Sequence, residues 1–254
     1  MNLTGNTILI TGGSTGIGLA LAKKFVELEN KVIITGRTES KLAQAASEVS
    51  GIETIRCNAS DALAVADMAA RVKKDHPQLN VLINNAGIFL NKNLSKNDED
   101  LSTLTAEVDI NLSGPIRTVA ALIDVLIQNR GTVINVSSGL AFVPLASAPV
   151  YCATKAALHS YSLSLRAQLQ DHGVRVIELM PPAVRTELTA DLPEDAGFTI
   201  ISTDELVVAT IKGLRADRDE IRPGQANQLH WMSRVAPGFI NRQLAKNSKS
   251  LTSE

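Results

Sequence analysis

Short apolar runs rich in valine and isoleucine alternate along the chain with longer stretches in which apolar residues recur at helical spacing. A short run of this kind between turn signals is typical of a buried strand. The alternation of strand and helix favours an α/β fold in which a parallel sheet has helices on both faces. The seven runs predicted as strands are Thr7–Thr11, Lys31–Gly36, 53–57, Val81–Asn84, Thr132–Val136, 175–180 and a short one at 220–223.

The stretches between these runs carry the pattern of amphipathic helices, with apolar residues at i, i+3, i+4 and i+7 on one stripe. Two stripes are Leu42, Ala45, Ala46 and Val49, and Val65, Met68, Ala69 and Val72. Thr38 stands where it can cap the first of these helices. Further helices are predicted up to about residue 28, over about 102–128, over about 149–172, and after a capping box formed by Ser202 and Glu205.

Three segments lack a clear period. Residues 90–100 are polar and asparagine-rich, and we expect a surface loop there. Residues 183–201 hold scattered apolar side chains and are predicted to form a lid. The tail from residue 225 is broken at Pro237 and Gly238, which predicts a helix and a docked extension. With no repeat or linker, we expect one domain over 1–254, with its lid at about 183–201 and its extension at about 225–254.

The charge balance excludes several classes of partner. The 254 residues include 25 Lys and Arg and 26 Asp and Glu, which gives a net charge of −1. No basic tract points to nucleic acid, and no apolar run is expected to approach the roughly 18 residues of a membrane span. The first strand begins so soon after Met1 that a signal peptide has no room, so we expect a cytoplasmic protein.

The cysteines and histidines point to neither a disulfide framework nor a metal site. Cys57 and Cys152 are expected to be buried thiols. The histidines lack the mutual spacing of metal ligands and are expected to be surface or helix residues: His76, His159, His172 and His230.

A glycine-rich turn lies between the first strand and the first helix. Glycines let the backbone approach a phosphate group, and a helix N-terminus offers free N–H groups to it. This layout is typical of a Rossmann-like, doubly wound fold that binds a dinucleotide. The residues expected to contact the cofactor here are Gly12, Ser14, Thr15, Gly16, Ile17 and Gly18.

Tyr151 and Lys155 stand one helical turn apart and therefore share a face. A free phenol has a pKa of about 10. A nearby cation favours the phenolate and lowers that pKa, which makes the phenol a usable general acid or base. The alternative is a pair of surface residues on an amphipathic helix, because this spacing often arises by chance.

Several motifs occur together in one order and at one spacing. They are Thr11-Gly12-x-x-x-Gly16-Ile17-Gly18, Asn84-Asn85-Ala86-Gly87, Asn111, Ser138, Tyr151-x-x-x-Lys155 and Pro181-x-x-Val184-x-Thr186. From about residue 3 to the seventh strand, the chain resembles the shorter branch of the short-chain dehydrogenase/reductase family. Within that family, the Pro-Pro-Ala-Val run at 181–184 and the tail at 231–246 are similar to DltE-type oxidoreductases.

The resemblance implies catalytic roles. Tyr151 would be the acid in reduction and the base in oxidation, and Lys155 would bind the nicotinamide ribose and lower the tyrosine pKa. Ser138 would hydrogen-bond the carbonyl oxygen, with Ser137 as its structural neighbour. Asn111 would hold its helix open and support a water relay to Lys155. These roles suit hydride transfer, because two aimed O–H donors stabilise charge that develops on oxygen.

The resemblance also implies the remaining cofactor contacts. Asn85 is expected to be structural, and Gly87 to pack under the adenine. Three positions depart from the family pattern: Pro182 replaces a glycine, Asn58 replaces an aspartate, and Thr15 lacks the basic side chain of some NADPH users. The contacts carried over are Asn58, Ala59, Asn85, Ala86, Gly87, Pro181, Val184 and Thr186, beside Tyr151 and Lys155.

The end of the second strand favours NADP(H), with NAD(H) as the alternative. NAD-specific members place a carboxylate there, and this chain has Gly36. Arg37 follows and can bind a 2′-phosphate through two hydrogen bonds, while Thr38 adds a hydroxyl. A solvated loop arginine is the alternative interpretation of Arg37.

These observations predict an oxidoreductase that interconverts a carbonyl and an alcohol on a small, largely apolar molecule. Leu140, Phe142 and Val143 are expected to line its substrate pocket, or alternatively to fill the core. The helices at 102–128 and 149–172 predict a homodimer or homotetramer, as in the family. The rival hypothesis is a non-catalytic NADP-binding sensor or scaffold protein.

Overall fold

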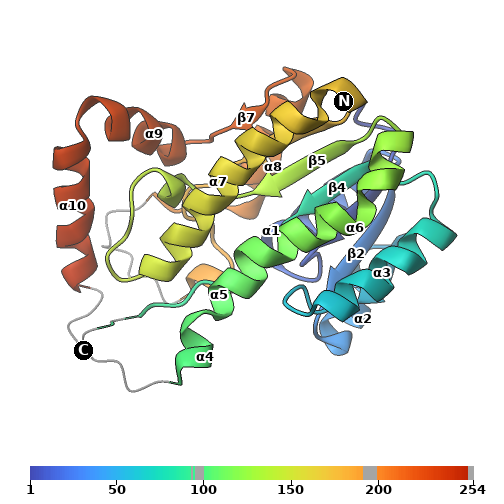
Figure 1. Ribbon diagram of the computed structural model, residues 1–254, viewed down its shortest axis with the longest axis horizontal. Helices are drawn as coiled ribbons and strands as arrows, with labels where there is room; N and C mark the ends of the chain where they lie inside the picture. The colour runs from blue at the N-terminus through green and yellow to red at the C-terminus, as the bar shows by residue number, and fades with distance from the viewer. Residues whose placement is uncertain (93, 95–99, 191–198, 251–254) are drawn as a thin grey trace.

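The sheet has seven strands, as predicted, and all of its neighbouring strands are parallel (Figure 1). The computed structural model describes residues 1–92, 94, 100–190 and 199–250. The strands are β1 (Thr7–Thr11), β2 (Lys31–Gly36), β3 (Ile52–Arg56), β4 (Val81–Asn84), β5 (Thr132–Val136), β6 (Arg175–Leu179) and β7 (Glu220–Ile221).

The strand order is β3-β2-β1-β4-β5-β6-β7. From β1 the chain therefore proceeds outward to β3 on one side, returns to β4, and proceeds outward to β7 on the other side. The two halves diverge between β1 and β4. In open parallel sheets, ligands bind outside the carboxyl ends of the strands at this switch point.

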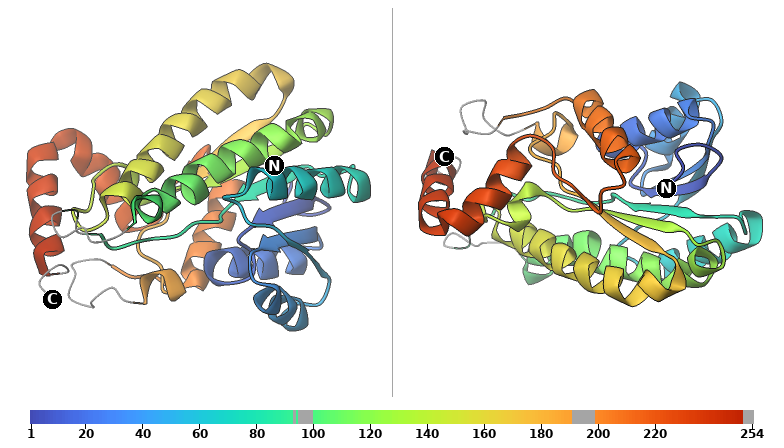
Figure 2. Two further views of the ribbon diagram at one scale, coloured as in Figure 1. Left: turned by 60° about the horizontal axis from the view of Figure 1, so that its bottom comes forward. Right: turned by 90° about the horizontal axis from the view of Figure 1, so that it is seen from above.

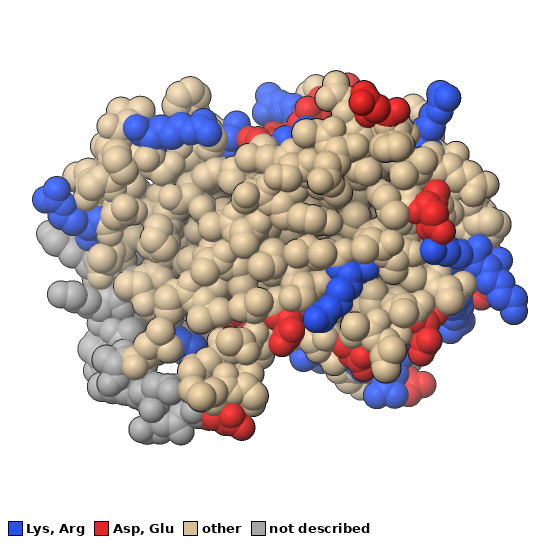
Figure 3. Space-filling view, viewed as in Figure 1, with Lys and Arg blue, Asp and Glu red and all other residues tan. Residues whose placement is uncertain are grey.

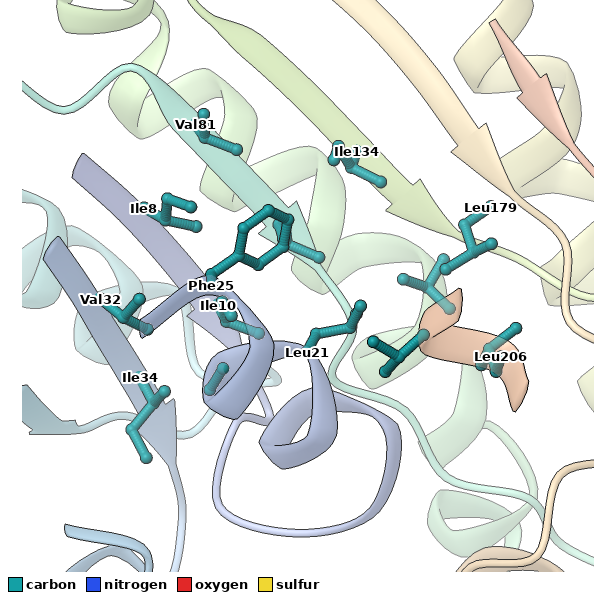
Figure 4. Close-up of a cluster of buried hydrophobic side chains, with 14 of the residues drawn as sticks. Ile8, Ile10, Leu21, Phe25, Val32, Ile34, Val81, Ile134, Leu179 and Leu206 are labelled. Atoms are coloured by element: carbon teal, nitrogen blue, oxygen red, sulfur yellow. The ribbon is translucent and has the colours of Figure 1, made fainter. Parts of the chain in front are cut away.

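Two helical layers cover the sheet (Figure 2). Helices α1 (Gly16–Glu27), α2 (Glu39–Glu48) and α8 (Thr203–Arg215) lie on one face, and α3 (Ala62–Asp75), α6 (Gly114–Gln128) and α7 (Pro149–Leu169) lie on the other. The strands contribute apolar side chains to the cores on both faces of the sheet, because successive side chains of a strand point to opposite faces. Ile8 and Ile10 pack with Phe25 of α1 (Figure 4), whereas Leu9 packs with the α3 and α6 layer.

The single long helix predicted over 102–128 is interrupted. It consists of α4 (Leu101–Leu104), α5 (Ala106–Val108), a π-helical segment η2 (Asp109–Ser113) and α6. A π-helical segment inside a helix frequently marks a functional site. The stretch Ala106–Gln128 is also long and apolar enough to cross a membrane by length and composition, contrary to expectation. Half of its most apolar window is buried within the fold.

Helix termini agree with the sequence in part. Ser202 and Glu205 form the predicted capping box of α8. Thr38 occupies the N-cap of α2, but its side chain makes no capping hydrogen bond. His76 was expected on the surface or within a helix; instead it is buried at the C-cap of α3, with Nε2 3.1 Å from Oε2 of Glu53.

The C-terminal tail forms two helices, α9 (Gln225–Val235) and α10 (Pro237–Ser250), where one helix and an extension were predicted. Ile240 and Leu244 of α10 pack against Val143 and Leu229. Val143 is therefore part of a small core under the tail, and the expectation that it lines a substrate pocket is wrong.

Candidate active site

A cleft of about 550 Å³ opens at the carboxyl ends of the strands, on both sides of the switch point. It brings together nearly all of the predicted site residues, with Gly18 and Asn111 as the exceptions among them. The predicted residues that line it are Gly12, Ser14, Thr15, Gly16, Ile17, Arg37, Thr38, Asn58, Ala59, Asn85, Ala86, Gly87, Ser138, Tyr151, Lys155, Pro181, Val184 and Thr186.

The glycine-rich turn has the geometry of a phosphate cradle. Gly12 has a φ of +64° and Gly16 of +54°, which favour glycine. A Cβ atom on Gly12 would lie 2.8 Å from the Cα of Ala86, so the backbones could not approach as they do. Thr15 is the N-cap of α1 without a side-chain capping bond, which leaves the first N–H groups of α1 for an anion. These features fit a dinucleotide phosphate.

Gly18 and Asn85 have structural roles behind the cradle. A Cβ atom on Gly18 would collide with the carbonyl oxygen of Gly12 and with the side chain of Asn85. The Asn85 amide nitrogen donates to the carbonyl oxygens of Thr11 (3.1 Å) and Gly12 (3.0 Å). The structural role expected for Asn85 is thereby confirmed, while Gly18 supports the turn without lining the cleft.

Tyr151 and Lys155 lie in the first half of α7, and both are almost fully buried, at 8% and 5% exposed. Lys155 Nζ is 5.6 Å from the centroid of the Tyr151 ring and donates a 2.9 Å hydrogen bond to the carbonyl oxygen of Val136. The Ser138 side chain forms a hydrogen bond with the phenol and accepts the Leu140 N–H at 3.1 Å. A phenol, a hydroxyl and an ammonium group thus converge at one end of the cleft.

Burial governs the ionisation of these groups. Burial raises the pKa of Tyr151, and the hydrogen bond from Ser138 only partly opposes this. The net shift is thus upward, because desolvation penalises the phenolate more than the Ser138 hydrogen bond favours it. The expected contribution of Lys155, which would lower the phenol pKa, stays a prediction. Burial also lowers the pKa of Lys155 to about 8, against the raising influence of the carboxylates of Glu178 and Glu107.

Asn111 lies behind the cleft, fully buried in the π-helical segment η2. Its Oδ1 accepts the Ile88 N–H at 2.8 Å, and its Nδ2 donates to the Ile88 carbonyl oxygen at 2.9 Å and to Thr154 Oγ1 at 3.3 Å. A Cβ atom on Gly87 would lie 3.2 Å from Asn111 Oδ1 and 3.8 Å from Lys155 Nζ. Gly87 therefore lies beside Lys155 and Asn111, while its expected packing under the adenine stays a prediction.

Two buried acidic residues near Lys155 were not identified from the sequence. Glu178 on β6 is fully buried, accepts a hydrogen bond from Ser137 Oγ and contacts His159 Nδ1 at 2.8 Å. This contact raises the pKa of His159. Glu107 on α5 is 1% exposed. The only signal for Glu178 in the sequence is a carboxylate between the apolar residues Ile177 and Leu179 of a strand.

The opposite end of the cleft is basic. Arg37 and Lys41 both line it, and Lys41 was not among the predicted residues. Lys41 Nζ lies 2.7 Å from Oε2 of Glu187, which belongs to the short helix η5 (Glu187–Thr189) after β6. The ion pair therefore spans the cleft, and because both side chains are exposed it contributes little to stability.

The model of the family described as short chain dehydrogenase matches residues 6–197. The chain belongs to the short-chain dehydrogenase family. Similarity to DltE-type proteins is confirmed: this short-chain dehydrogenase is 45% identical to the uncharacterized oxidoreductase DltE of Bacillus subtilis, over 87% of this chain and 89% of that protein.

Two further similarities extend along most of this short-chain dehydrogenase. It is 33% identical to serine 3-dehydrogenase of Rhizobium radiobacter, over 92% of this chain and 90% of that enzyme. It superposes on the solved structure of a short chain dehydrogenase from Burkholderia cenocepacia in complex with NADP, with a TM-score of 0.85 and 26% identity. That match covers 96% of this chain and 99% of the other. The protein is therefore an NAD(P)-dependent oxidoreductase acting on alcohols and carbonyls.

The lowered pKa of Lys155, about 8, predicts how the rate of carbonyl reduction depends on pH. A phenol that gives up its proton becomes a phenolate, which a neighbouring ammonium group stabilises and a neutral amine does not. We expect kcat for reduction to fall as the pH rises past about 8, where Lys155 loses its proton. Initial rates at saturating substrate between pH 6 and pH 10 check this, and a flat profile over that range would contradict it.

Proposed function

We propose that this protein is an NADP(H)-dependent oxidoreductase that interconverts a carbonyl and an alcohol on a small, largely apolar molecule. The observation that carries the proposal is the convergence of the Tyr151 phenol, the Ser138 hydroxyl and the Lys155 ammonium at the end of a dinucleotide-shaped cleft. The bound nicotinamide cofactor supplies or accepts the hydride.

The chain's own residues orient the reacting groups and move the proton. Tyr151 donates its proton to the carbonyl oxygen in reduction and accepts it in oxidation. Ser138 donates a second hydrogen bond to that oxygen, where negative charge develops. Lys155 binds the ribose hydroxyls and favours the phenolate that Tyr151 becomes. Asn111, fixed by Ile88 and Thr154, supports a water relay that returns a proton to Lys155.

The adenosine end of the cleft supports NADP(H) over NAD(H). Gly36 replaces the carboxylate that would repel a 2′-phosphate, and a Cβ atom there would lie only 3.1 Å from Ser14 Oγ and 3.3 Å from Leu42 Cδ2. Arg37 and Lys41 supply two positive charges to the same end. Lys41 thus provides the second basic group that Thr15 does not. The Burkholderia cenocepacia neighbour, solved with NADP, agrees with this preference.

The substrate end of the cleft supports an apolar substrate. Apolar side chains form its wall, and Leu140 is among them as predicted, whereas Phe142 packs against His159 and His230 instead. Other apolar wall residues include Phe89, Leu145, Leu188 and Leu229. Serine 3-dehydrogenase is a relative, but the substrate end of this cleft does not favour an amino-acid substrate. Among the described lining residues at this end, Lys155 is the one cation, and it is proposed to bind the ribose. An amino-acid carboxylate is usually bound by a free arginine or lysine.

The lid remains part of the proposal. Leu188 and Thr189 line the cleft, Val184 forms a bridge to Ile201, and the Thr199 N–H donates to Gln225 Oε1 of α9 at 3.1 Å. These contacts hold both ends of the insertion over the cleft. Residues 191–198 of the predicted lid lie outside the described residues. A cover of this kind excludes water from the reacting groups.

Replacement of Tyr151 by phenylalanine tests the proton-transfer role. The change removes only the hydroxyl, so we expect turnover to fall by at least about a hundredfold while the dissociation constant for NADPH changes far less. Oxidation of NADPH with a panel of apolar ketones and aldehydes, and reduction of NADP with serine, measures both the role and the substrate class. Wild-type turnover in Tyr151→Phe would remove the phenol from the mechanism, and a wild type active on no carbonyl would favour the sensor hypothesis.

Arg37→Ala and Lys41→Ala test the cofactor preference. Because each removes a charge proposed to face the 2′-phosphate, we expect kcat/KM for NADPH to fall by about tenfold or more while that for NADH is retained. Lys73→Ala is the matched control, since Lys73 also forms an exposed 2.7 Å ion pair, with Asp124 on α6. A wild type that prefers NADH, or a double variant that still prefers NADPH, would contradict the assignment.

We also expect a homodimer or homotetramer. The face formed by α6 and α7 carries few charged side chains (Figure 3), and Ile116 and Leu163 are exposed on it. Pairing of such faces about a two-fold axis buries both copies of the patch. Light scattering at micromolar concentration should give a multiple of the 27.1 kDa chain mass, and Leu163→Glu should shift the mass toward the monomer. A monomeric wild type would refute the prediction.

A further inference from the structure

The buried carboxyl group of Glu107 has no place in the proton-transfer scheme above. Glu107 lies on α5, one helical turn before Asn111, so the two side chains project from the same face. Asn111 binds the backbone of Ile88 and the hydroxyl of Thr154. Glu107 does the equivalent one turn earlier: its Oε1 accepts the Leu90 N–H at 2.8 Å, and its carboxyl group also takes a hydrogen bond from the Tyr151 backbone N–H.

The N-terminus of α7 explains why a carboxyl group is needed there. The N-cap residue is Ala148, whose side chain cannot accept a hydrogen bond, and Pro149 occupies the start of the helix. Tyr151 follows two residues later, where a helix N–H has no partner within the helix. An N-cap side chain normally accepts this N–H. Here an acceptor from another helix takes its place, and its negative charge also suits the positive end of the helix dipole.

The same carboxyl group fixes the segment that faces the tyrosine ring. Phe89 lies between Ile88 and Leu90, the two residues that Asn111 and Glu107 bind. The Phe89 ring meets the Tyr151 ring edge to face, with centroids 4.9 Å apart. The Tyr151 phenol is therefore held on two sides, by the start of α7 and by Phe89, and Glu107 binds the Tyr151 N–H and the N–H of Leu90, the residue next to Phe89.

We propose that Glu107 is a positioning residue for Tyr151: it caps α7 from a neighbouring helix and holds the Phe89 segment against the phenol. The inference rests on the proposed role of Tyr151 in proton transfer. Glu107 itself touches neither substrate nor cofactor, since it lies outside the residues that line the cleft.

The charge of Glu107 should affect the pH dependence of kcat, which would not change if Glu107 only supported the local structure. The ionisable groups that face it are Lys92, Lys155, Tyr151 and Cys152. Glu107 raises the pKa of Lys155, as does Glu178, and it raises the pKa of Tyr151. Loss of the Glu107 charge therefore lowers both pKa values, so the fall in kcat expected at alkaline pH should begin at lower pH.

Glu107→Gln is the test variant. The side-chain volume stays the same, but one carboxylate oxygen, an acceptor, becomes an NH2 group, a donor, that would face a backbone N–H. We expect kcat to fall by about ten- to a hundredfold and the dissociation constant for NADPH to stay unchanged. We also expect the alkaline limb of the pH profile, which is the fall in kcat above about pH 8 in the wild type, to move to lower pH. The matched control is Glu205→Gln, which removes another carboxylate that caps a helix, α8, away from the cleft. The control should keep the wild-type kcat and pH profile.

Ala148→Ser separates the capping role from a general loss of structure, because serine gives α7 its own N-cap. In the Glu107→Gln background it should recover part of kcat without restoring the position of the limb. Wild-type kcat in Glu107→Gln would overturn the proposal, as would a lower kcat with an unmoved limb. Tyr151→Phe measured in parallel keeps the two hypotheses apart: if it is inactive while Glu107→Gln is fully active, only the role of Glu107 fails.

Discussion

The hydrogen bond from Lys155 to the carbonyl oxygen of Val136 joins α7 to the sheet. It fixes α7 against the carboxyl end of β5, and with it the position of Tyr151 relative to Ser138. A buried ammonium group is costly to desolvate, and its pKa falls accordingly. Two buried carboxylates, Glu178 and Glu107, offset part of this cost, which gives a physical reason for acidic residues in an otherwise apolar environment.

The seven strands and the cofactor cleft could be predicted because they depend on local signals. Runs of β-branched residues bounded by turns are readable residue by residue, and the glycine-rich turn carries its own geometric requirement. The interruption at Asp109–Ser113 could not be predicted in the same way. A π-helical segment of five residues alters the hydrogen-bond ladder of the helix without a clear change in the apolar period. The contacts that Asn111 makes within it are with Ile88 and Thr154, which are distant in the sequence.

The errors at the site share one physical origin, which is burial. The sequence shows that Lys155 is close to Tyr151, and it does not show that both are desolvated, so it does not reveal that burial raises the net pKa of Tyr151. His76 and Val143 were misplaced for a related reason. Whether a side chain is covered depends on which element packs over it, and for Val143 that element is α10, almost a hundred residues further along the chain.

The Thr11 hydroxyl shows how the width of the cleft is defined. Its Oγ1 accepts the N–H groups of both Asn85 (3.0 Å) and Ala86 (3.1 Å), at the point where β1 and β4 diverge. Together with the Asn85 amide, which bonds the carbonyl oxygens of Thr11 and Gly12, this oxygen atom fixes the separation of the two halves where β1 and β4 end. That separation does not depend on the lengths of the connecting segments. The loops around the cleft can therefore change, and with them the substrates that fit, while the cofactor binds in the same position.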